Sequence, residues 1–547
     1  MIFPVGADPD REGRSPNRSA FAPQKNGRHS VLRLLIPGAL GGLLLLSACK
    51  PPAEQAAGYA QQAQQLADAG HFEAALNAMQ KALAARDDNA QYFLQLAGIH
   101  MRLGNPPQAY MAARRALDLD GANRNTLTLV ANLGLQVGQV DEADAAADQL
   151  LSVEPGSLVA LQVKGLVALY KNKDQEAEGY GQRLLQVSPT DEAGTIIRAR
   201  VLAKAQKYDE AIALVDNTIT LGRTTPALLI TKINLYRVLR RPEDMARVFD
   251  QLQGYVTDPP ASLQLDRINL LYKLGRTEPA RQAAGKLLVS GAGSANDLET
   301  LRRIWAEYDP VPFTRESVKS ASNWKDPIAL LSVGRYLLWQ GQPQLADDLF
   351  FSFREGARPI AISLHHRAWL ALGHSRQDVQ ARMDAVLKRD PTDVDALILR
   401  AVFAMQDHNP GLAIEGLEKA IGADPENPET YVELSRTYAQ SGNRWRAGQV
   451  FEDGLKQLPQ SFLLIDRYTQ FLHDSGNKSR AVSVSRAFAR TLPSSVRAWT
   501  IMAQQCAWAG DAACAAEAAA GRQTAATTYQ VDDAPGTPPD RGLLGKF

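Results

Sequence analysis

The sequence has few of the residues that most enzymes and metalloproteins use for chemistry. Its 547 residues include three cysteines and eight histidines, and none of them has the spacing of a zinc site. It also lacks a phosphate-binding loop, a dinucleotide-binding glycine run, and the HExxH and GxSxG elements of common hydrolases. These absences predict a non-catalytic protein with no catalytic residues, metal or cofactor.

A charge excess of one sign is also missing. Lysine and arginine together number 60, aspartate and glutamate 59, and the formal net charge is +1. A balanced chain has no overall attraction for nucleic acid or for an anionic membrane surface. No zinc-finger, RNA-recognition or helix-turn-helix signature supplies a local exception. We therefore expect no nucleic-acid partner.

Long hydrophobic runs are absent except for one segment near the N-terminus. Residues 34–46 are rich in leucine but contain proline and glycine. The run is too short for a comfortable membrane span and suits the hydrophobic region of a signal peptide. It ends in Leu46-Ser47-Ala48-Cys49, which resembles a bacterial lipobox. The resemblance implies cleavage before Cys49 and acylation of that cysteine, and several acyl chains anchor stably because each buried methylene contributes about 0.8 kcal/mol.

The predicted signal peptide therefore covers residues 1–49, and a short linker follows at 50–55. Lys50 follows the cysteine, and in lipoproteins of Gram-negative bacteria this favours the outer membrane over the inner one. An ordinary signal peptide, or a membrane helix that happens to contain a cysteine, is the alternative. Residues 1–30 are polar and longer than a usual n-region, so we expect translation to start near Val31 or Leu32; a genuine long n-region is the other interpretation.

A strict repeat runs through the rest of the chain. Alanines recur every 34 residues in two series, and glycines lie five residues before several of them. A fixed period of this size is typical of a stacked-repeat protein, in which each unit contacts its neighbours. Apolar positions with helical spacing predict a helix, a glycine turn and a second helix in each unit. The alanines are Ala75, Ala109, Ala143, Ala177, Ala211, Ala413, Ala447, Ala481 and Ala515, and the glycines are Gly70, Gly104, Gly138, Gly442, Gly476 and Gly510.

The pattern resembles the tetratricopeptide repeat family. The clearest unit runs from Pro428 to Ser461 and departs from the family pattern at Ser435 and Gly454, where glycine and alanine are preferred. The resemblance implies an all-α, right-handed α-solenoid of stacked helix-turn-helix units whose first helices line a concave face. The matching residues of the unit are Tyr431, Leu434, Tyr438, Gly442, Ala447, Phe451 and Pro459.

The register divides the mature chain into two arrays. Residues 56–294 hold a first array, whose seventh unit is slipped by one residue. Residues 295–326 break the register and are either a degenerate repeat or a hinge. Residues 327–529 hold a second array, and the proline-rich tail 530–547 is expected to be disordered.

The family resemblance also implies where a partner would bind. In such arrays the ninth position of each unit usually points into the groove. Asparagine there can donate and accept hydrogen bonds, as an extended peptide backbone requires, and arginine can hold a carboxylate in a bidentate manner. The alternative is a solvated helix face on which polar residues have no partner. The candidate groove residues are Asn132, Arg200, Asn234, Asn269, Arg335 and Arg436; other units have Gln64, Gly98, Leu166, Ala368 and Val402 at this position.

Two cysteines remain besides the lipobox residue. Cys506 and Cys514 lie on either side of the Gly510 turn, one on each helix of the last repeat. Cysteines that face each other across a helical hairpin can approach disulfide distance, and an exported chain meets an oxidising compartment. We therefore predict a Cys506–Cys514 disulfide that holds the last repeat together. The alternative is two small buried residues in an alanine-rich helix pair.

Together these features predict a lipid-anchored scaffold of the bacterial envelope that faces the periplasm and binds envelope proteins through its groove. Export of an exopolysaccharide, or secretion, is the process we expect by analogy. Alternatives are an assembly factor for a pilus or for outer-membrane machinery, a glycan-binding module with aromatic residues such as Trp339 and Trp508 in the groove, and a cytosolic adaptor with a misread N-terminus.

Overall fold

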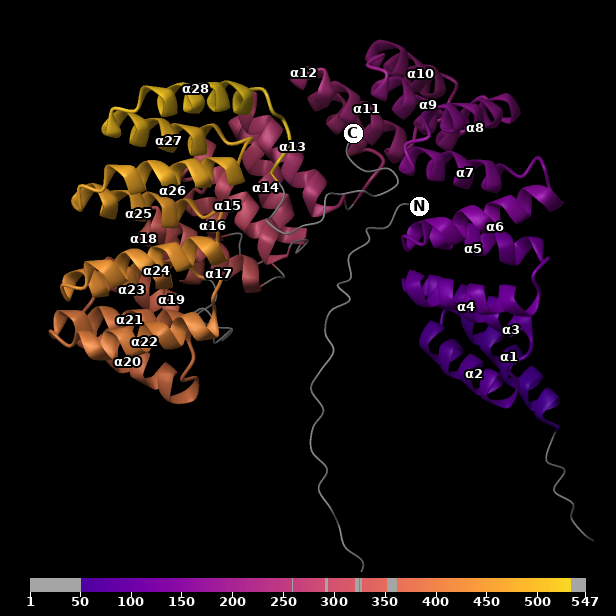
Figure 1. Cartoon of the computed structure of the whole chain (residues 1–547). Coiled ribbons are helices and arrows are strands. Elements are labelled where there is room, and N and C mark those ends of the chain that lie inside the picture. Colours follow the sequence, from indigo (N-terminus) through magenta and orange to yellow (C-terminus); the bar gives the residue numbers. More distant parts are fainter. Residues whose placement is uncertain are drawn as a thin grey trace, which may run out of the picture. The chain divides into compact units, whose positions relative to one another are not determined.

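A computed structural model describes residues 51–257, 259–290, 294–319, 324, 327–351 and 362–532. Within these ranges the chain forms 28 α-helices and no strand, so the predicted all-α solenoid is confirmed (Figure 1). None of these helices is long and apolar enough to cross a membrane. Cys49, with the rest of the predicted signal peptide, lies outside the described residues, as does the tail beyond Asp532.

The chain divides into two compact units between Ala205 and Gln206. We call the described residues up to Ala205 unit 1. The boundary falls between the two helices of the fifth predicted repeat. Unit 1 comprises α1 (Pro52–Asp68), α2 (Phe72–Ala85), α3 (Ala90–Arg102), α4 (Pro106–Leu119), α5 (Arg124–Gln136), α6 (Val140–Val153), α7 (Leu158–Tyr170), α8 (Asp174–Val187) and α9 (Glu192–Lys204).

Unit 2 contains the remaining helices, from Gln206 onward. They are α10 (Tyr208–Thr220), α11 (Pro226–Val238), α12 (Pro242–Leu252), α13 (Ala261–Lys273), α14 (Thr277–Ser290), α15 (Ala295–Tyr308), α16 (Arg315–Lys319), α17 (Pro327–Trp339), α18 (Pro343–Phe351), α19 (Ile362–Ala371), α20 (Arg376–Arg389), α21 (Val394–Gln406), α22 (Pro410–Ala423), α23 (Pro428–Gln440), α24 (Arg444–Gln457), α25 (Phe462–Asp474), α26 (Lys478–Thr491), α27 (Val496–Ala509) and α28 (Ala512–Ala526).

Most first helices of the described chain start at a side-chain N-cap, and these caps follow the 34-residue period. A short polar side chain immediately before the helix accepts a hydrogen bond from a backbone N–H of the first turn, a contact that stabilises a helix by about 1 kcal/mol. Asp191, for example, accepts from the Gly194 amide at 2.7 Å. The same role is filled by Asn89, Asn123, Ser157, Thr225, Asp393, Asn427, Ser461 and Ser495.

The turn inside each helix pair needs a residue with positive φ, and glycine fills it in most repeats, as at Gly70 (φ 79°) and Gly442 (φ 86°). Four repeats have another residue at the same register position, and these residues adopt the same left-handed conformation. They are Asn172, Gln206, Arg240 and His408, with φ between 54° and 60°. The backbone of the turn is therefore retained where the glycine is not.

Close packing inside each pair explains the small residues of the pattern. The repeated alanines from Ala75 to Ala481 are all fully buried. The two departures in the unit Pro428–Ser461 have physical reasons as well. Ser435 donates a hydrogen bond from Oγ to the Ala447 carbonyl at 2.8 Å. A Cβ at Gly454 would lie 2.9 Å from the Tyr431 ring, so the glycine makes room for that ring.

The segment 295–326 begins with a long helix and ends with a short one. α15 starts with a capping box at Ser294 and packs between the first helices α13 and α17. α16 has only five residues and packs on α18. α15 thus keeps a first-helix position in the stack, and its Trp305 is among the largest fully buried side chains of the described chain.

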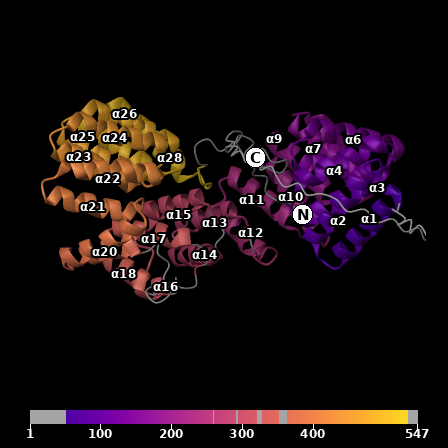
Figure 2. The same ribbon diagram turned by 90° about the horizontal axis from the view of Figure 1, so that it is seen from below.

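Unit 2 closes on itself. Lys273, at the end of α13, donates hydrogen bonds to the carbonyls of Ser494 (3.1 Å), Ala525 (2.9 Å) and Thr528. Helices far apart in the sequence of unit 2, such as α15 and α27, share one hydrophobic core, and α28 lies beside α13 in both views (Figure 1, Figure 2). We call this junction, formed by Lys273, Glu307 and the residues that they contact, the closing contact.

Two further interactions complete the closing contact. Glu307 of α15 accepts hydrogen bonds from Ser495 Oγ (2.6 Å) and the Val496 amide (2.9 Å), at the start of α27. Asp532 accepts from Ser494 Oγ at 2.7 Å. The first residues of the segment expected to be disordered, 530–532, are therefore placed against unit 2, and the rest of that segment lies outside the described residues.

Candidate partner-binding groove

Two adjoining clefts lie along the first helices of unit 1. One, of about 610 Å³, is bounded by α1, α2 and α3; the other, of about 380 Å³, lies between α3 and α5. Both clefts are lined by Gln91 and Leu94, so they form one continuous surface. We call this surface the unit 1 groove and define it by Gln64, Gln91, Leu94, Gln95, Gly98, Asn125, Thr128, Leu129 and Asn132.

The clefts of the unit 1 groove are lined mainly by amide and apolar side chains, and Asp68 and Arg102 add one charge of each sign. Gln64, Gln91 and Asn132 are exposed, and Leu94 is half-buried between them. Each amide can donate and accept hydrogen bonds, and Gln64 already donates from Nε2 to Asp68 at 2.8 Å. The Oε1 atom of Gln95 is buried and has no hydrogen-bond partner within the described residues. Buried acceptors are usually satisfied, so this oxygen marks a place in the groove where a hydrogen-bond donor is missing.

The predicted groove residues of unit 1 do not all lie together. Asn132 is in the groove, next to the α3 residues Gln91 and Leu94. Gln64 and Gly98, which hold the same register position in the first two repeats, line the adjoining cleft. Arg200 is half-buried on α9, two first helices beyond Asn132 in the stack. Only Asn132 of the six candidates is placed in the groove.

The other four candidates belong to unit 2. Asn234 is 7% exposed and accepts a hydrogen bond from Arg237 Nη1 at 2.6 Å. Asn269 is 5% exposed. Arg436 is half-exposed and forms an ion pair with Glu433, one turn away on α23. A partner would reach neither Asn234 nor Asn269 without a change in the packing around them.

Arg335, the sixth candidate, belongs to a buried charge network on the inner face of unit 2. Its guanidinium group pairs with Asp395 (3.0 Å) and Asp424 (3.1 Å). Arg367 pairs with the other oxygen of Asp395 at 2.7 Å and also with Glu429. Burial alone would raise the pKa of Asp395, but the two guanidinium groups outweigh it and hold that pKa below its usual range. We call these five residues the inner charge network.

Sequence reasoning missed Arg367, Asp395 and Glu429. Asp395 and Glu429 lie in the first turns of α21 and α23, where an acidic residue favours the helix dipole and needs no partner. Arg367 lies in the middle of α19, and nothing in its spacing indicates a partner. The tryptophans expected to face a groove are also engaged. Trp339 donates from Nε1 to Glu429 at 2.8 Å, and the Arg302 guanidinium lies over its ring. The ring of Trp508 stacks on His473, with centroids 3.8 Å apart.

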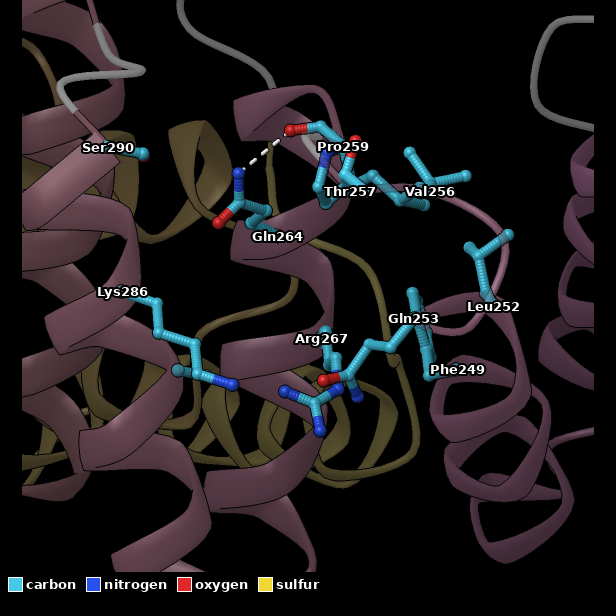
Figure 3. Close-up of a pocket in the computed structure, with 12 residues that line it drawn as sticks. Phe249, Leu252, Gln253, Val256, Thr257, Pro259, Gln264, Arg267, Lys286 and Ser290 are labelled. Atoms are coloured by element: carbon cyan, nitrogen blue, oxygen red, sulfur yellow. Dashed lines mark hydrogen bonds between the residues drawn. The ribbon is translucent and has the colours of Figure 1, made fainter.

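A third cleft interrupts the stacking of unit 2 where the register slips by one residue. It has a volume of about 300 Å³ and lies between α12 and the pair α13–α14 (Figure 3). Phe249 and Leu252 of α12 form an apolar wall on one side of the cleft. Arg267 of α13 and Lys286 of α14 line the other side. α12 has 11 residues, fewer than the second helices of unit 1, so it leaves this gap uncovered.

The two cysteines of the last repeat, and the neighbouring residues His365 and His366 of α19, lie outside these clefts. The Cα atoms of Cys506 and Cys514 are 5.5 Å apart and both side chains are buried, with their sulfurs facing each other. His365 is hydrogen-bonded to Asp347 at 2.7 Å, and His366 packs against Trp369. In the described part of the chain no group of histidine, cysteine and carboxylate residues is arranged to hold a metal ion.

The architecture defines the class of protein: an α-solenoid, in which helix pairs stack through neighbouring contacts. Residues 61–124 match the family model of the tetratricopeptide repeat. The same 34-residue register of helix pairs continues beyond the matched segment. These findings support the tetratricopeptide repeat family, as the sequence resemblance predicted, and repeats of this family generally serve as non-catalytic scaffolds that bind other proteins.

Several solved structures are similar to parts of the chain. A tetratricopeptide repeat protein from Parabacteroides merdae is 18% identical and covers 45% of this chain and 96% of its own, with a TM-score of 0.39. Pseudomonas aeruginosa pilF is 22% identical over 38% of this chain and 93% of its own (TM-score 0.30). PilW, described as a widely conserved type IV pilus biogenesis factor, is 19% identical over 36% and 92% (TM-score 0.31). No curated protein matches the sequence.

Proposed function

We propose that the protein is a non-catalytic scaffold whose unit 1 groove holds an extended segment of a partner protein. The observation that carries this proposal is the set of exposed amides around the unpartnered Oε1 atom of Gln95. A peptide backbone offers alternating N–H and C=O groups, and amide side chains can pair with both. Half-buried Leu94 and Leu129 add apolar contacts between the amides.

A protein partner is favoured over a glycan because the aromatic rings once expected to face a groove are engaged. Glycan recognition would use exposed ring faces, but Arg302 lies over Trp339, and Trp508 is stacked on His473. The groove of unit 1 is instead lined by amides and leucines. This difference leads us to place partner binding in unit 1.

We further propose that the scaffold is a lipoprotein, attached through acylated Cys49 to the outer membrane and facing the periplasm. The Leu-Ser-Ala-Cys sequence and Lys50 support this location. In that compartment Cys506 and Cys514 would form the disulfide for which they are placed. Incorporation of labelled palmitate that is lost in Cys49→Ala would support the anchor, whereas unchanged incorporation would contradict it.

The process served is proposed by analogy alone: export of an exopolysaccharide, or secretion, with assembly of a pilus or of outer-membrane machinery as the alternative. The identity of the captured partner decides between these processes. The partner-binding experiment therefore has to recover that partner from intact envelopes.

Two glycines give a matched pair of variants for this experiment. A Cβ at Gly98 or at Gly179 would have no atom within 4 Å, so a side chain at either position extends into open space. Gly98 lies in the groove on α3, whereas Gly179 lies on the second helix α8 and lines neither cleft. Gly98→Arg fills the groove, and Gly179→Arg makes the same chemical change elsewhere in the same unit.

Crosslinking and affinity purification from intact envelopes would compare the wild type with both variants. We expect a specific partner that is recovered with the wild type and with Gly179→Arg but lost with Gly98→Arg. Recovery of the same partner with all three proteins would indicate that the partner binds outside the groove. Circular dichroism of the purified variants checks that each one is folded.

A further inference from the structure

Unit 2 contains a cavity that the proposed function does not use. It has a volume of about 210 Å³ and lies among four first helices, α15 and α17 from the first half of unit 2 and α25 and α27 from near its end. It exists because unit 2 closes on itself and brings these helices together. We call it the arginine cavity, after four of its lining residues: Arg302, Arg303, Arg467 and Arg497.

The charges around the arginine cavity do not balance. Two carboxylates, Glu299 and Asp466, line it as well. Glu299 pairs with Arg302, and Asp466 pairs with Arg497 at 2.6 Å. Within the described residues, Arg303 and Arg467 form no ion pair. The lining therefore carries two more positive than negative charges.

Burial makes this excess costly. Arg303 is 7% exposed. It donates to Thr300 Oγ1 at 2.8 Å and to the Asp532 carbonyl at 3.4 Å, but its Nε has no hydrogen-bond partner in the described structure. The Nε of Arg302 is also without a partner there. Burial lowers the pKa of Arg303, and the nearby carboxylates Glu299, Asp532 and Glu307 offset this only in part. A buried cation whose charge is incompletely balanced destabilises the fold that contains it.

A bound anion would balance the excess positive charge and would accept hydrogen bonds from the Nε atoms that have no partner. Guanidinium groups bind oxyanions through several N–H donors at once. The cavity is smaller than the ~300–1,000 Å³ of sites for drug-sized ligands, so the anion must be compact. Two unbalanced positive charges match a phosphate group, which carries about −1.5 to −2 at neutral pH; a single carboxylate would balance only one of them.

We propose that the arginine cavity binds a phosphate group, either free inorganic phosphate or a phosphomonoester. Arg303 and Arg467 supply the unpaired charge, and Arg302 and Arg497 complete the wall. Because these residues come from both ends of unit 2, the ligand also holds the closing contact together. This site is independent of the unit 1 groove, so either proposal can fail without the other.

Isothermal titration calorimetry on the full mature chain tests the site, with inorganic phosphate and glycerol 3-phosphate as probes and glycerol as the neutral control. Arg467→Gln removes an exposed arginine that has no ion pair in the described structure. Arg490→Gln is the matched control: its side chain is 64% exposed and does not line the cavity, and its partner Glu517 keeps Arg486.

We expect saturable binding of one phosphate group per chain, weakened at least tenfold in Arg467→Gln and unchanged in Arg490→Gln. Binding of both probes indicates a site open to esters, and binding of phosphate alone indicates a site for the free ion. Absence of saturable binding of either probe to the wild type would overturn the proposal. Equal weakening by the two variants would also overturn it, because it would indicate a general effect of charge.

Thermal unfolding gives a second readout. All seven tryptophans lie in unit 2, so their fluorescence reports on this unit alone. A ligand that binds only the folded state raises the unfolding midpoint. Phosphate should therefore raise the midpoint of the wild type and of Arg490→Gln at constant ionic strength, and should leave that of Arg467→Gln unchanged. A rise of the same size in all three proteins would contradict the assigned site.

Discussion

Unit 1 leaves amides exposed along its first helices, whereas unit 2 covers much of its own inner face with pairs of opposite charge. The same helix pair, repeated in the same register, builds both. Unit 1 offers Gln64, Gln91 and Asn132 to a partner, while Arg335 and Arg367 of unit 2 are already paired with carboxylates of the same unit. The comparison shows that register position alone does not make a binding residue; what faces that position decides whether it is available.

The largest effect should come from opening the inner charge network. Asp395→Ala removes the carboxylate shared by Arg335 and Arg367 and leaves two buried guanidinium groups less than fully paired. Breaking a buried ion pair on one side costs about 3–5 kcal/mol. We expect a loss of this size in the free energy of unfolding of unit 2, measured by tryptophan fluorescence in urea.

The matched change in unit 1 is Asp144→Ala. Asp144 holds Lys164 and Lys171, but the side chains are 13–30% exposed and solvent screens the pairs. We expect a loss of about 1 kcal/mol or less, measured by circular dichroism. Equal losses in the two variants would mean that the greater burial of the unit 2 network does not make its ion pairs costlier to break.

A smaller loss is expected when the closing contact is weakened. Lys273→Met removes the donor to three backbone carbonyls, and a buried acceptor left without a partner costs roughly 1–3 kcal/mol. We expect unit 2 to lose about 2–3 kcal/mol and the amides of α28 to exchange hydrogen faster by mass spectrometry. Lys286→Met, at an exposed lysine in the α12–α13 cleft, should change neither quantity. Unchanged exchange in α28 after Lys273→Met would argue against the closing contact.

Acid should weaken unit 2 through His366. Burial, followed by the nearby His365 and Arg382, lowers the pKa of His366 to about 4. The unfolded state then binds a proton near pH 6.5 that the folded state does not bind until about pH 4. Stability from this group is complete above pH 6.5 and is lost as the pH falls toward 4, by about 3 kcal/mol. His366→Gln should flatten fluorescence-monitored unfolding free energies between pH 6.5 and 4; an unchanged slope would contradict the assignment.

The smallest effect is a gain in unit 1. Gly98 lies inside α3, where a Cβ meets open space. Gly98→Ala should stabilise unit 1 by about 0.5–1 kcal/mol because alanine has the higher helix propensity. Circular dichroism should record the gain, and tryptophan fluorescence should not change. A loss of stability would indicate that the groove is tighter around Gly98 than the structure describes.

Much of the fold could be predicted because its signals are local and repeated. The alanine period predicted the helix pairs, and the N-caps at Asn89 and Asp191 recur with it. The period also marks Gln206 and Arg240 as turn residues, but their side chains suggest no turn, so only their place in the register identifies them. The closing contact was not predicted, because Lys273 and Ala525 are far apart in sequence and no periodic signal connects them.

The binding surface was harder to predict for the same reason. The family register selected Asn132, which lines the groove, and equally selected Asn234 and Asn269, which are buried. A register position defines a direction relative to the helix axis, but burial depends on the neighbouring side chains. The partner of Arg335 lies on another helix, and a single sequence does not record that pairing. The proposed roles of Arg200 and Arg436 stay predictions.

The closing contact has a consequence for how such a chain can change its length. In an open stack each repeat contacts only its neighbours, so a whole 34-residue unit can be gained or lost with little effect elsewhere. Unit 1 meets that condition along its stack. In unit 2 an added repeat would separate Lys273 from the carbonyls of Ser494 and Ala525. Natural variation in repeat number should therefore accumulate in unit 1, while the number in unit 2 stays fixed.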